Sequence, residues 1–269
     1  MYYHHIYFSF DNTKNPLREE TTIIDSYIEK NCPDLTYKFW SYNDAIAFIE
    51  QHYSCFIEFF KLDTPFPIIK CDLFRYILMY HFGGVYTDLD FICIQPFDTF
   101  LKMLNQSKIN YQPNHIRSPS IILSEEWLNS SSFTNTLHNG ILISLKQKHP
   151  FWLNLIFEIY QSVIINKQPI TCKNDVFEIS GPKKLNKYYL NNIDKFSDVC
   201  ILPYFYFCPY ISINKDGSKV LYNYSMINKP KTDDVNWIFF NINDHSQLSE
   251  LCPNSFFICI YLNTGSMWK

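Results

Sequence analysis

The sequence predicts an α/β protein, and two patterns carry that prediction. Residues 4–10 and 35–40 are β-prone runs, and the stretch 19–31 between them reads as a helix. A strand–helix–strand unit of this kind implies that the two strands pair in parallel. Residues 68–81 suit a largely buried helix because they are apolar and contain no Pro or Gly, and the β-prone run 85–87 follows. At 269 residues, one domain with a sizeable core is expected.

The rest of the chain continues this alternation. Residues 45–62 look helical, the β-run 138–144 precedes a helix from 149 to about 165, and Pro182 suits the first turn of a further helix. The remaining expected strands are 199–202, 204–207 and 256–261. The polar stretches 105–119 and 125–137 read as loops, which commonly carry binding function.

Composition excludes some classes of function. The formal net charge is −3, so the chain has no basic footprint for nucleic acid. Nine cysteines are scattered without a Cys-x-x-Cys pair, which favours buried, reduced thiols. The start of the chain has no basic region, and no run of about 18 apolar residues exists, so neither a signal peptide nor a transmembrane segment is expected. We therefore expect a cytoplasmic protein, unless an anchor lies outside this sequence.

A pair of carboxylates follows the run 85–87. Gly83-Gly84 ends the preceding helix, because glycine adopts the positive φ of a helix C-terminus cheaply, and the run ends on Asp88-Leu89-Asp90. Two carboxylates one residue apart can meet one hard cation, and their oxygens suit Mg²⁺ or Mn²⁺. By itself the Asp-x-Asp pattern is a weak signal, since a polar turn after a strand has the same sequence.

The preceding helix strengthens the metal interpretation. Asp72 and Arg75 are three residues apart and share one helix face. A surface ion pair would explain them, but the helix is otherwise apolar, so this face is expected to be buried. Buried charges need partners. Sugar hydroxyls suit an Asp, and diphosphate oxygens suit the guanidinium fork of an Arg.

The two segments together resemble a known family. Asp72-x-x-Arg75-Tyr, followed by the Gly-Gly-x-Tyr-x-Asp-x-Asp run of residues 83–90, is similar to the Asp-x-Asp sugar-nucleotide glycosyltransferases. That family includes yeast Golgi initiating α-mannosyltransferases, sphingolipid mannosyltransferases, bacterial capsular-polysaccharide transferases and, more distantly, the large clostridial glucosylating toxins. The resemblance implies a GT-A-type (nucleotide-diphospho-sugar transferase) domain: a mixed, mainly parallel, twisted sheet flanked by helices, with the site at the carboxyl ends of its strands.

The resemblance also implies a reaction and its cofactor. It would be the metal-dependent, retaining transfer of a sugar from a UDP- or GDP-sugar to a glycan, lipid or protein acceptor, with Mn²⁺ or Mg²⁺. The leaving phosphate itself would help to deprotonate the acceptor. The roles implied for the matching positions are Asp90 as a metal ligand, Asp88 on ribose or sugar hydroxyls and on the metal, Asp72 on the donor sugar, Arg75 on the departing diphosphate, and Tyr86 and Trp268 on phosphates.

Two further positions near the nucleoside are implied, each with a structural alternative. Tyr7 stands at the end of the first strand, where relatives place the base, and it suits stacking as well as core packing. Asn43 matches an Asn that holds the nucleoside in the toxin relatives; alternatively, Asn43 or Asp44 is a helix N-cap. The pair His4-His5 could ligate a metal, although a structural role is more common for such a pair.

Two positions near the donor sugar are implied in the same way. Asn139 faces the sugar if the segment follows the family's Asn-x-x-x-x-Ser and Gly-His-Pro-Phe pattern, and it is a turn residue otherwise. Ser180-Gly181-Pro182 resembles the family's Thr-Gly-Pro. A helix start there would offer free N–H groups to an anionic or hydroxylated ligand, unless Ser180 only caps the helix.

The end of the chain completes the resemblance. Relatives close their catalytic region with Gly-Ser-Trp or Ser-x-Trp, which Ser266 and Trp268 match, and Asn263 stands three residues before the Ser. Asn263 and Ser266 are therefore expected to complete the metal shell that Asp88 and Asp90 begin. Many relatives have a His just upstream that this chain lacks, a departure that concerns metal affinity. Without the resemblance, this tail would read as a frayed terminus.

We expect one domain over 1–269. Its donor-binding core would be 1–100 and 136–190, and its acceptor-side and closing segments would be 100–135 and 190–269. Two alternatives remain. A haloacid-dehalogenase-type phosphatase also places Asp-x-Asp after a strand, but it needs a longer strand than residues 85–87. A non-catalytic relative that binds sugar nucleotides or glycans would fit the missing His, but not the intact charged positions.

Overall fold

A computed structural model describes residues 1–8, 18–106, 108–109, 118–126, 136–207, 211–213, 219–222, 237–239, 252 and 254–259. Its centre is a sheet of six strands in the order β2-β1-β3-β6-β5-β7. The strands are β1 (Tyr2–Tyr7), β2 (Thr36–Ser41), β3 (Gly84–Thr87), β5 (Ile121–Glu125), β6 (Leu137–Ser144) and β7 (Val199–Leu202). Strand β6 alone is antiparallel to its neighbours in this sheet, and the other pairs are parallel.

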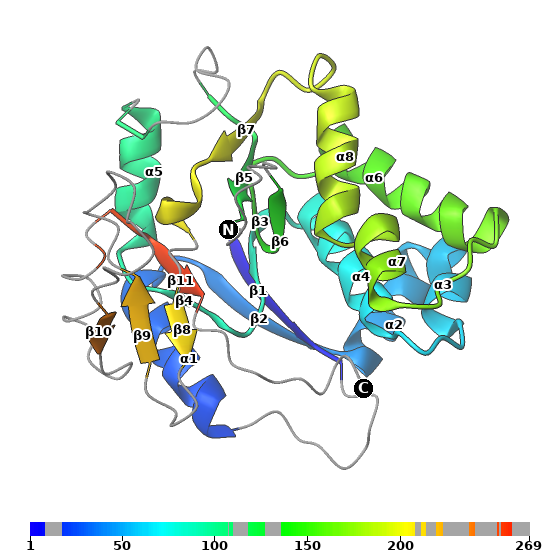
Figure 1. Ribbon diagram of the computed structural model, residues 1–269, viewed down its shortest axis with the longest axis horizontal. Coiled ribbons are helices and arrows are strands. Elements are labelled where there is room, and N and C mark those ends of the chain that lie inside the picture. The colour runs from blue at the N-terminus through cyan, green and yellow to red at the C-terminus, as the bar shows by residue number, and fades with distance from the viewer. Residues whose placement is uncertain are drawn as a thin grey trace.

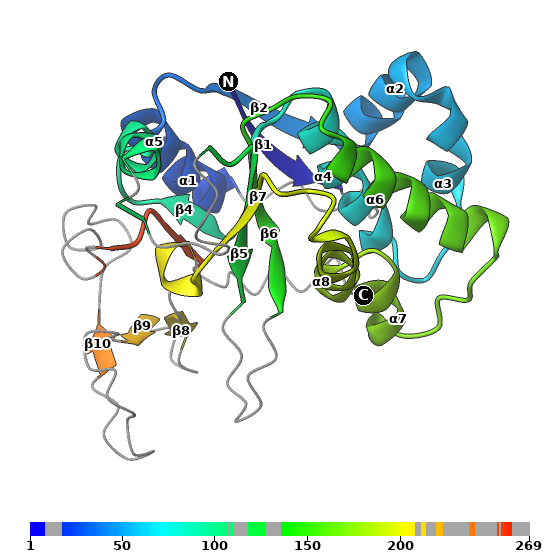
Figure 2. The same cartoon turned by 90° about the horizontal axis from the view of Figure 1, so that it is seen from above.

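Helices cover both faces of the sheet (Figures 1 and 2). One side carries α1 (Arg18–Asn31) and α5 (Phe97–Asn105). The other side carries α2 (Tyr42–His52), α3 (Ile57–Lys61), α4 (Ile68–His81), α6 (Pro150–Tyr160), α7 (Lys173–Ile179) and α8 (Pro182–Asn192). The sheet side chains alternate between two cores. In β5, for example, Ile121 and Leu123 pack with α4 and α6, and Ile122 packs with α5. The predicted mixed, mainly parallel sheet flanked by helices is confirmed.

Helix α4 is the most deeply buried element. The residues from Ile68 to Met79 are all buried, which suits a helix without a polar face. It begins after Pro67 and ends before Gly83 and Gly84, whose φ angles of 61° and 90° confirm the predicted glycine stop. A Cβ on Gly84 would stand 2.2 Å from the backbone oxygen of Tyr2, so this position also lets β3 lie against β1.

The antiparallel direction of β6 brings the site together. Because β6 runs against β3, its first residues lie beside the last residues of β3, where Thr87 pairs with Ile141. Asp88 and Asn139 therefore reach the same end of the sheet. This is the carboxyl end of the parallel strands β1 and β3, where ligands bind in open α/β sheets.

Several short elements complete the chain. The strands β4 (Phe91–Cys93) and β11 (Phe257–Cys259) form a two-stranded ribbon, and β8 (Ile211–Ile213), β9 (Lys219–Tyr222) and β10 (Trp237–Phe239) form a separate three-stranded sheet. A 3₁₀ turn at Ser54–Phe56 links α2 to α3, and a π-helical turn at Gln161–Ile165 extends α6. The described cysteines form no disulfide, as predicted, but Cys55 and Cys172 are exposed, whereas the other described cysteines are buried as expected.

Three local predictions are wrong. Residues 204–207 are not a strand, because Tyr204–Tyr206 form a 3₁₀ turn after Pro203. The helix expected over 45–62 starts earlier, at Tyr42, and is interrupted at Tyr53. The N-cap of α8 is Gly181, and Ser180 ends α7 instead. The expectation of a single domain over 1–269, with its donor and acceptor segments, stays a prediction.

Candidate active site

The side chain of Arg75 lies at the centre of the candidate site. It is 3% exposed, and its guanidinium contacts three oxygens from three parts of the chain. Nη1 donates to the backbone oxygen of Asn139 at 2.8 Å and lies 3.1 Å from Asp88 Oδ1, and Nη2 lies 3.2 Å from Asp72 Oδ1. The ring of Tyr86 lies 4.9 Å from the guanidinium carbon. Because the fork contacts α4, β6 and the end of β3 together, its direction is fixed before any ligand arrives.

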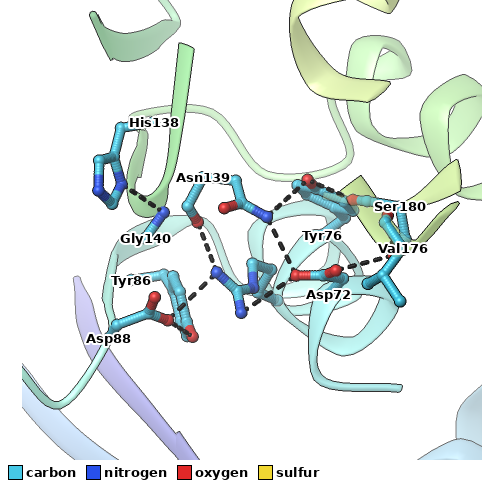
Figure 3. A network of polar contacts seen from close by, with 10 residues as sticks. Asp72, Tyr76, Tyr86, Asp88, His138, Asn139, Gly140, Val176 and Ser180 are labelled. Carbon is cyan, nitrogen blue, oxygen red and sulfur yellow. Dashed lines mark hydrogen bonds and ion pairs between the residues drawn. The ribbon is translucent and has the colours of Figure 1, made fainter. Parts of the chain in front are cut away.

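Asp72 is held at both carboxylate oxygens. Asn139 Nδ2 donates to Oδ1 at 3.0 Å, and the buried Ser180 hydroxyl donates to Oδ2 at 2.7 Å, as Figure 3 shows. The Ser180 backbone oxygen in turn accepts a hydrogen bond from the Tyr76 hydroxyl. Burial raises the pKa of Asp72, while Arg75 and the Ser180 hydroxyl oppose that rise. The result is a rigid carboxylate that reaches the site from the interior.

Asp88 and Asp90 form the more open part of the site. The side chain of Asp88 is 34% exposed, and its Oδ1 also accepts a hydrogen bond from the Tyr86 hydroxyl. Burial raises the pKa of Asp90 to about 7, and the neighbouring charge of Asp88 adds to the rise. Two carboxylates this close repel one another, so a cation between them is favoured.

The donor set fits the implied ion. Among the described residues, no three His, Cys, Asp or Glu side chains gather closely enough to hold a metal by themselves. Mg²⁺ and Mn²⁺ do not need such a cage, since one or two carboxylates, waters and substrate phosphates commonly complete their shell. Asp88 and Asp90 would hold the ion, with open positions for a diphosphate. Asn263 and Ser266, the other predicted ligands, lie outside the described residues, as does Trp268.

Gly140 leaves room for the Asp88 carboxylate. A Cβ on Gly140 would stand 2.7 Å from Asp88 Oδ2 and 2.6 Å from Cε1 of His138. The Asp88 N–H donates to the Gly140 oxygen at 2.7 Å, and the Gly140 N–H donates to His138 Nδ1 at 2.9 Å. His138 is therefore held on the far side of the gap that Gly140 leaves (Figure 3). Burial lowers the pKa of His138 to about 4, so its ring is neutral at pH 7.

The substitution Gly140→Ala is expected to displace the Asp88 carboxylate and to lower turnover by about 10²-fold, since misplacement by about 1 Å has such an effect. Steady-state kinetics with the nucleotide-sugar donor measure this. Thermal unfolding of Gly140→Ala serves as the control for its fold, because the added methyl group would also meet Cε1 of His138. Full activity of Gly140→Ala would show that the gap is not needed.

The structure locates the other predicted residues as follows. Tyr7 is the last residue of β1 and is partly exposed at the same end of the sheet, and Asn43 is exposed in the first turn of α2. Neither Asn43 nor Asp44 is the N-cap of α2, which is Ser41, with Asp44 as its capping-box partner. The roles of Tyr7 and Asn43 at a nucleoside stay predictions.

The structure also shows the hydrogen bonds of the remaining predicted site residues. Tyr86 is 1% exposed with its hydroxyl on Asp88, so a phosphate contact would replace that hydrogen bond. The Gly181 N–H donates to the Val176 oxygen and is not free for a ligand, and the role of the following N–H groups of this helix start stays a prediction. His4 and His5 are buried and hydrogen-bonded within the fold, which confirms the structural reading. Asn139 lies at the site, and its role on a sugar stays a prediction.

Sequence reasoning missed Ser180 and Tyr76 as parts of the site. Ser180 was read as a helix cap, because Ser followed by Gly-Pro is typical of a helix start. Tyr76 lies four residues after Asp72 on α4, so the two share one helix face, and this spacing was the signal that could have found it.

Comparison with known proteins shows what this region is similar to. Residues 18–110 match the family described as "Glycosyltransferase sugar-binding region containing DXD motif". The resemblance to the Asp-x-Asp glycosyltransferases is confirmed. The matched segment contains Asp72, Arg75, Asp88 and Asp90, and it ends before Asn139 and Ser180, which complete the arrangement around Arg75 and Asp72.

Curated relatives of this chain include yeast proteins named as mannosyltransferases and as mannosyl phosphorylinositol ceramide synthases. The chain is 38% identical over 71 residues to mannosyl phosphorylinositol ceramide synthase CSH1 of Saccharomyces cerevisiae, across 26% of this chain and 19% of that protein. It is 28% identical over 131 residues to inositol phosphoceramide mannosyltransferase 1 of Schizosaccharomyces pombe, across 49% and 37%. It is 33% identical over 104 residues to the initiation-specific alpha-1,6-mannosyltransferase of Saccharomyces cerevisiae, across 35% and 21%. The matches thus span between a fifth and just over a third of the relatives.

Among solved structures, the chain is similar to the PaToxG glycosyltransferase, with a TM-score of 0.43 and 12% identity over 71% of this chain and 69% of that chain.

The predicted cytoplasmic location is wrong in view of the yeast relatives, which are named for their action on inositol phosphoceramide, a membrane lipid. Over the described residues, none of the helices has the length and apolarity that crossing a membrane requires.

Proposed function

We propose that this chain is a metal-dependent, retaining glycosyltransferase that moves a sugar from a UDP- or GDP-sugar to a glycan, lipid or protein acceptor. The observation that carries the proposal is the buried guanidinium of Arg75, fixed between Asp72 and the Asp88 side of the Asp-x-Asp turn. The family match over residues 18–110 supports the same reaction class. Retention is inferred from the resemblance alone.

Arg75 would stabilise the charge of the departing nucleoside diphosphate. A guanidinium has five N–H donors, and the three contacts on α4, β6 and β3 leave two of them without a protein acceptor. One of these is Nε–H, which is buried and has no hydrogen-bond partner among the described residues. Ligand oxygens or ordered water would satisfy them. Since the arginine is already oriented, it would stabilise developing negative charge without reorganisation.

The carboxylates would divide the remaining tasks. Asp88 and Asp90 would hold the Mn²⁺ or Mg²⁺ ion, which supplies positive charge against the diphosphate when it is bound. Asp72 would accept hydrogen bonds from the donor sugar while Ser180 and Asn139 fix its plane. Asp72 is only 4% exposed, so a sugar would approach it from the Asp88 side, where the site is open. Because the relatives are named as mannosyltransferases, GDP-mannose is the first donor to test.

Slow hydrolysis of the donor tests the proposal without knowledge of the acceptor. The protein is incubated with a panel of UDP- and GDP-sugars and Mn²⁺, and the released nucleotide is measured. We expect release from one donor, and a loss of at least about 10²-fold in Asp90→Asn or with EDTA. Asp98→Asn is the control, since Asp98 is exposed and pairs only with Lys102 in the next helical turn.

If no nucleotide is released, calorimetry with the same donors measures whether they bind. Metal-dependent binding that Asp90→Asn abolishes would support donor recognition and would require an acceptor for turnover. Binding without turnover in the presence of yeast glycan and glycolipid acceptors would favour the non-catalytic alternative. An absence of binding to every donor would refute the proposal.

A further inference from the structure

A lysine in a strained backbone conformation lies far from the candidate active site. Lys148, in the loop from β6 to α6, has a φ of 56°, in the left-handed region that favours glycine. It occupies the first position of the segment that resembles Gly-His-Pro-Phe, where that pattern has glycine. Strain of this kind is retained where the surrounding structure or a function requires the side chain. The Lys148 N–H donates to the Tyr80 oxygen at 2.7 Å, which holds the backbone in this conformation but does not explain why the side chain is a lysine.

The ammonium of Lys148 is oriented by two neighbours. Nζ donates to the Tyr53 hydroxyl at 2.9 Å and lies 3.3 Å from His81 Nδ1, and the Tyr53 hydroxyl is itself 2.9 Å from His81 Nδ1. The ammonium also lies over the rings of Tyr80 and Tyr53. An ammonium has three N–H donors, so at least one remains for a ligand in solvent. Because Nδ1 of His81 faces two donors, its ring carries the proton on Nε2.

More nitrogen donors surround this lysine. The rings of His52 and His81 lie 5.1 Å apart, at the last residues of α2 and α4. Lys38, on β2, places its ammonium 4.2 Å from the Trp40 ring and 5.2 Å from the Phe82 ring, and Phe82 packs against His81. In the described part of the chain, no carboxylate pairs with Lys38 or Lys148. We call Lys38, His52, His81 and Lys148 the Lys148 patch.

We propose that the Lys148 patch is a binding site for a phosphate group. Two ammonium groups and two imidazoles from four elements offer donors to the several acceptor oxygens of a phosphate, and an unpaired cluster of this kind attracts anions. Each ammonium group lies over aromatic rings, which limits the positions that it can adopt. Free phosphate and a phospholipid headgroup present the same oxygens, and the test separates them.

The Lys148 patch is a different site from the one around Arg75. His81 is nine residues after Asp72 on α4, which is about 14 Å along the helix at 1.5 Å per residue. The patch lies beside Gly83 and the start of β1, where Tyr2 packs on Phe82, and thus at the amino ends of the strands. The proposal consequently does not depend on the proposed transferase activity.

Calorimetry at low ionic strength with inorganic phosphate, and flotation with phosphatidylcholine vesicles with or without phosphatidylinositol, test the proposal on the full chain. Lys148→Gly removes the ammonium and relieves the backbone, so it is expected to fold at least as well. We expect at least a tenfold loss of affinity in Lys148→Gly and in His52→Gln. Lys61→Ala, which removes an exposed lysine paired with Glu50, is expected to bind as the wild type does. Arg75→Lys, at the candidate active site, is also expected to bind phosphate normally.

Each result has a defined meaning. Binding of phosphate that Lys148→Gly weakens supports a site for soluble phosphate compounds, and flotation that depends on phosphatidylinositol and on Lys148 supports a lipid headgroup. If the wild type binds neither, or if Lys148→Gly binds both as tightly as the wild type does, the proposal is refuted and Lys148 is a packing residue. Loss of phosphate binding in Arg75→Lys would instead assign the phosphate to the active site.

Discussion

Replacing Arg75 by lysine is expected to lower nucleotide-sugar turnover by a factor on the order of 10²–10³. The guanidinium contacts the Asn139 backbone oxygen, Asp88 and Asp72 at once, and a single ammonium cannot reproduce that fork. The positive charge is retained, so the loss would measure geometry more than charge. Steady-state kinetics with the donor identified by nucleotide release give kcat and KM separately, and the decrease is expected mainly in kcat.

Stability must be followed in the same Arg75→Lys protein. The substitution leaves buried oxygens of Asp72 and Asn139 with fewer donors, which is expected to destabilise the fold by roughly 1–3 kcal/mol. Thermal unfolding separates this effect from the catalytic one, with Lys61→Met as a baseline for an exposed ion pair. Turnover of Arg75→Lys within tenfold of the wild type, in a folded protein, would remove Arg75 from its proposed role.

Acid is expected to destabilise the fold through two buried histidines. Burial lowers the pKa of His4 and of His5 from the ordinary 6.5 to about 3. His4 accepts from the Trp40 indole and contacts the Gly83 oxygen, with Lys38 as the nearby charge, and His5 contacts Thr87 and Tyr37. Both rings are neutral in the folded and the unfolded protein above pH 6.5, so neither contributes a pH dependence there.

The direction in which pH changes the free energy of unfolding follows from proton binding. Between pH 6.5 and 3 the unfolded chain binds protons that the folded chain excludes, so the free energy of unfolding falls as the pH falls. The slope approaches about 1.4 kcal/mol per pH unit for each histidine. Urea unfolding across this range in the wild type and in His4→Gln measures it, since other titrating groups are common to both. The variant is expected to be less stable at pH 7 but to show a shallower slope. Equal slopes would contradict the neutral, buried state of His4.

The sequence correctly predicted those features that depend on residues close together in the chain. Both ends of helix α4 were predicted, because an apolar run lies between Pro67 and the glycines at 83 and 84. The pairing of Asp72 with Arg75 followed from their spacing of one helical turn. The parallel pairing of β1 and β2 followed from the helix between them. In each case, the decisive interaction lies within or between neighbouring elements.

Contacts between distant segments were not predictable from the sequence. The side chain of Asn139 donates a hydrogen bond to Asp72, and its backbone oxygen accepts one from Arg75. Both contacts require β6 to be antiparallel to β3, and no local sequence pattern encodes that direction. Ser180 lies 108 residues from the Asp72 carboxylate to which it donates. The strand predicted over residues 204–207 was wrong for another reason. Four consecutive aromatics have high β-propensity, but the chain turns after Pro203, where the Tyr206 N–H donates to the Pro203 oxygen.

The pairing of Asp72 with Asn139 and Ser180 has a consequence for the order of events during synthesis. When α4 leaves the ribosome, the Asp72 carboxylate still lacks partners that are 67 and 108 residues away along the chain, and the Arg75 guanidinium lacks one that is 64 residues away. Burying α4 at that stage would leave charged groups unsatisfied, so its docking is expected to wait until residues 139 and 180 have emerged. The segment 18–110, which carries the Asp-x-Asp motif, therefore cannot complete its own site, and a nascent chain that stops there exposes an apolar helix to chaperones.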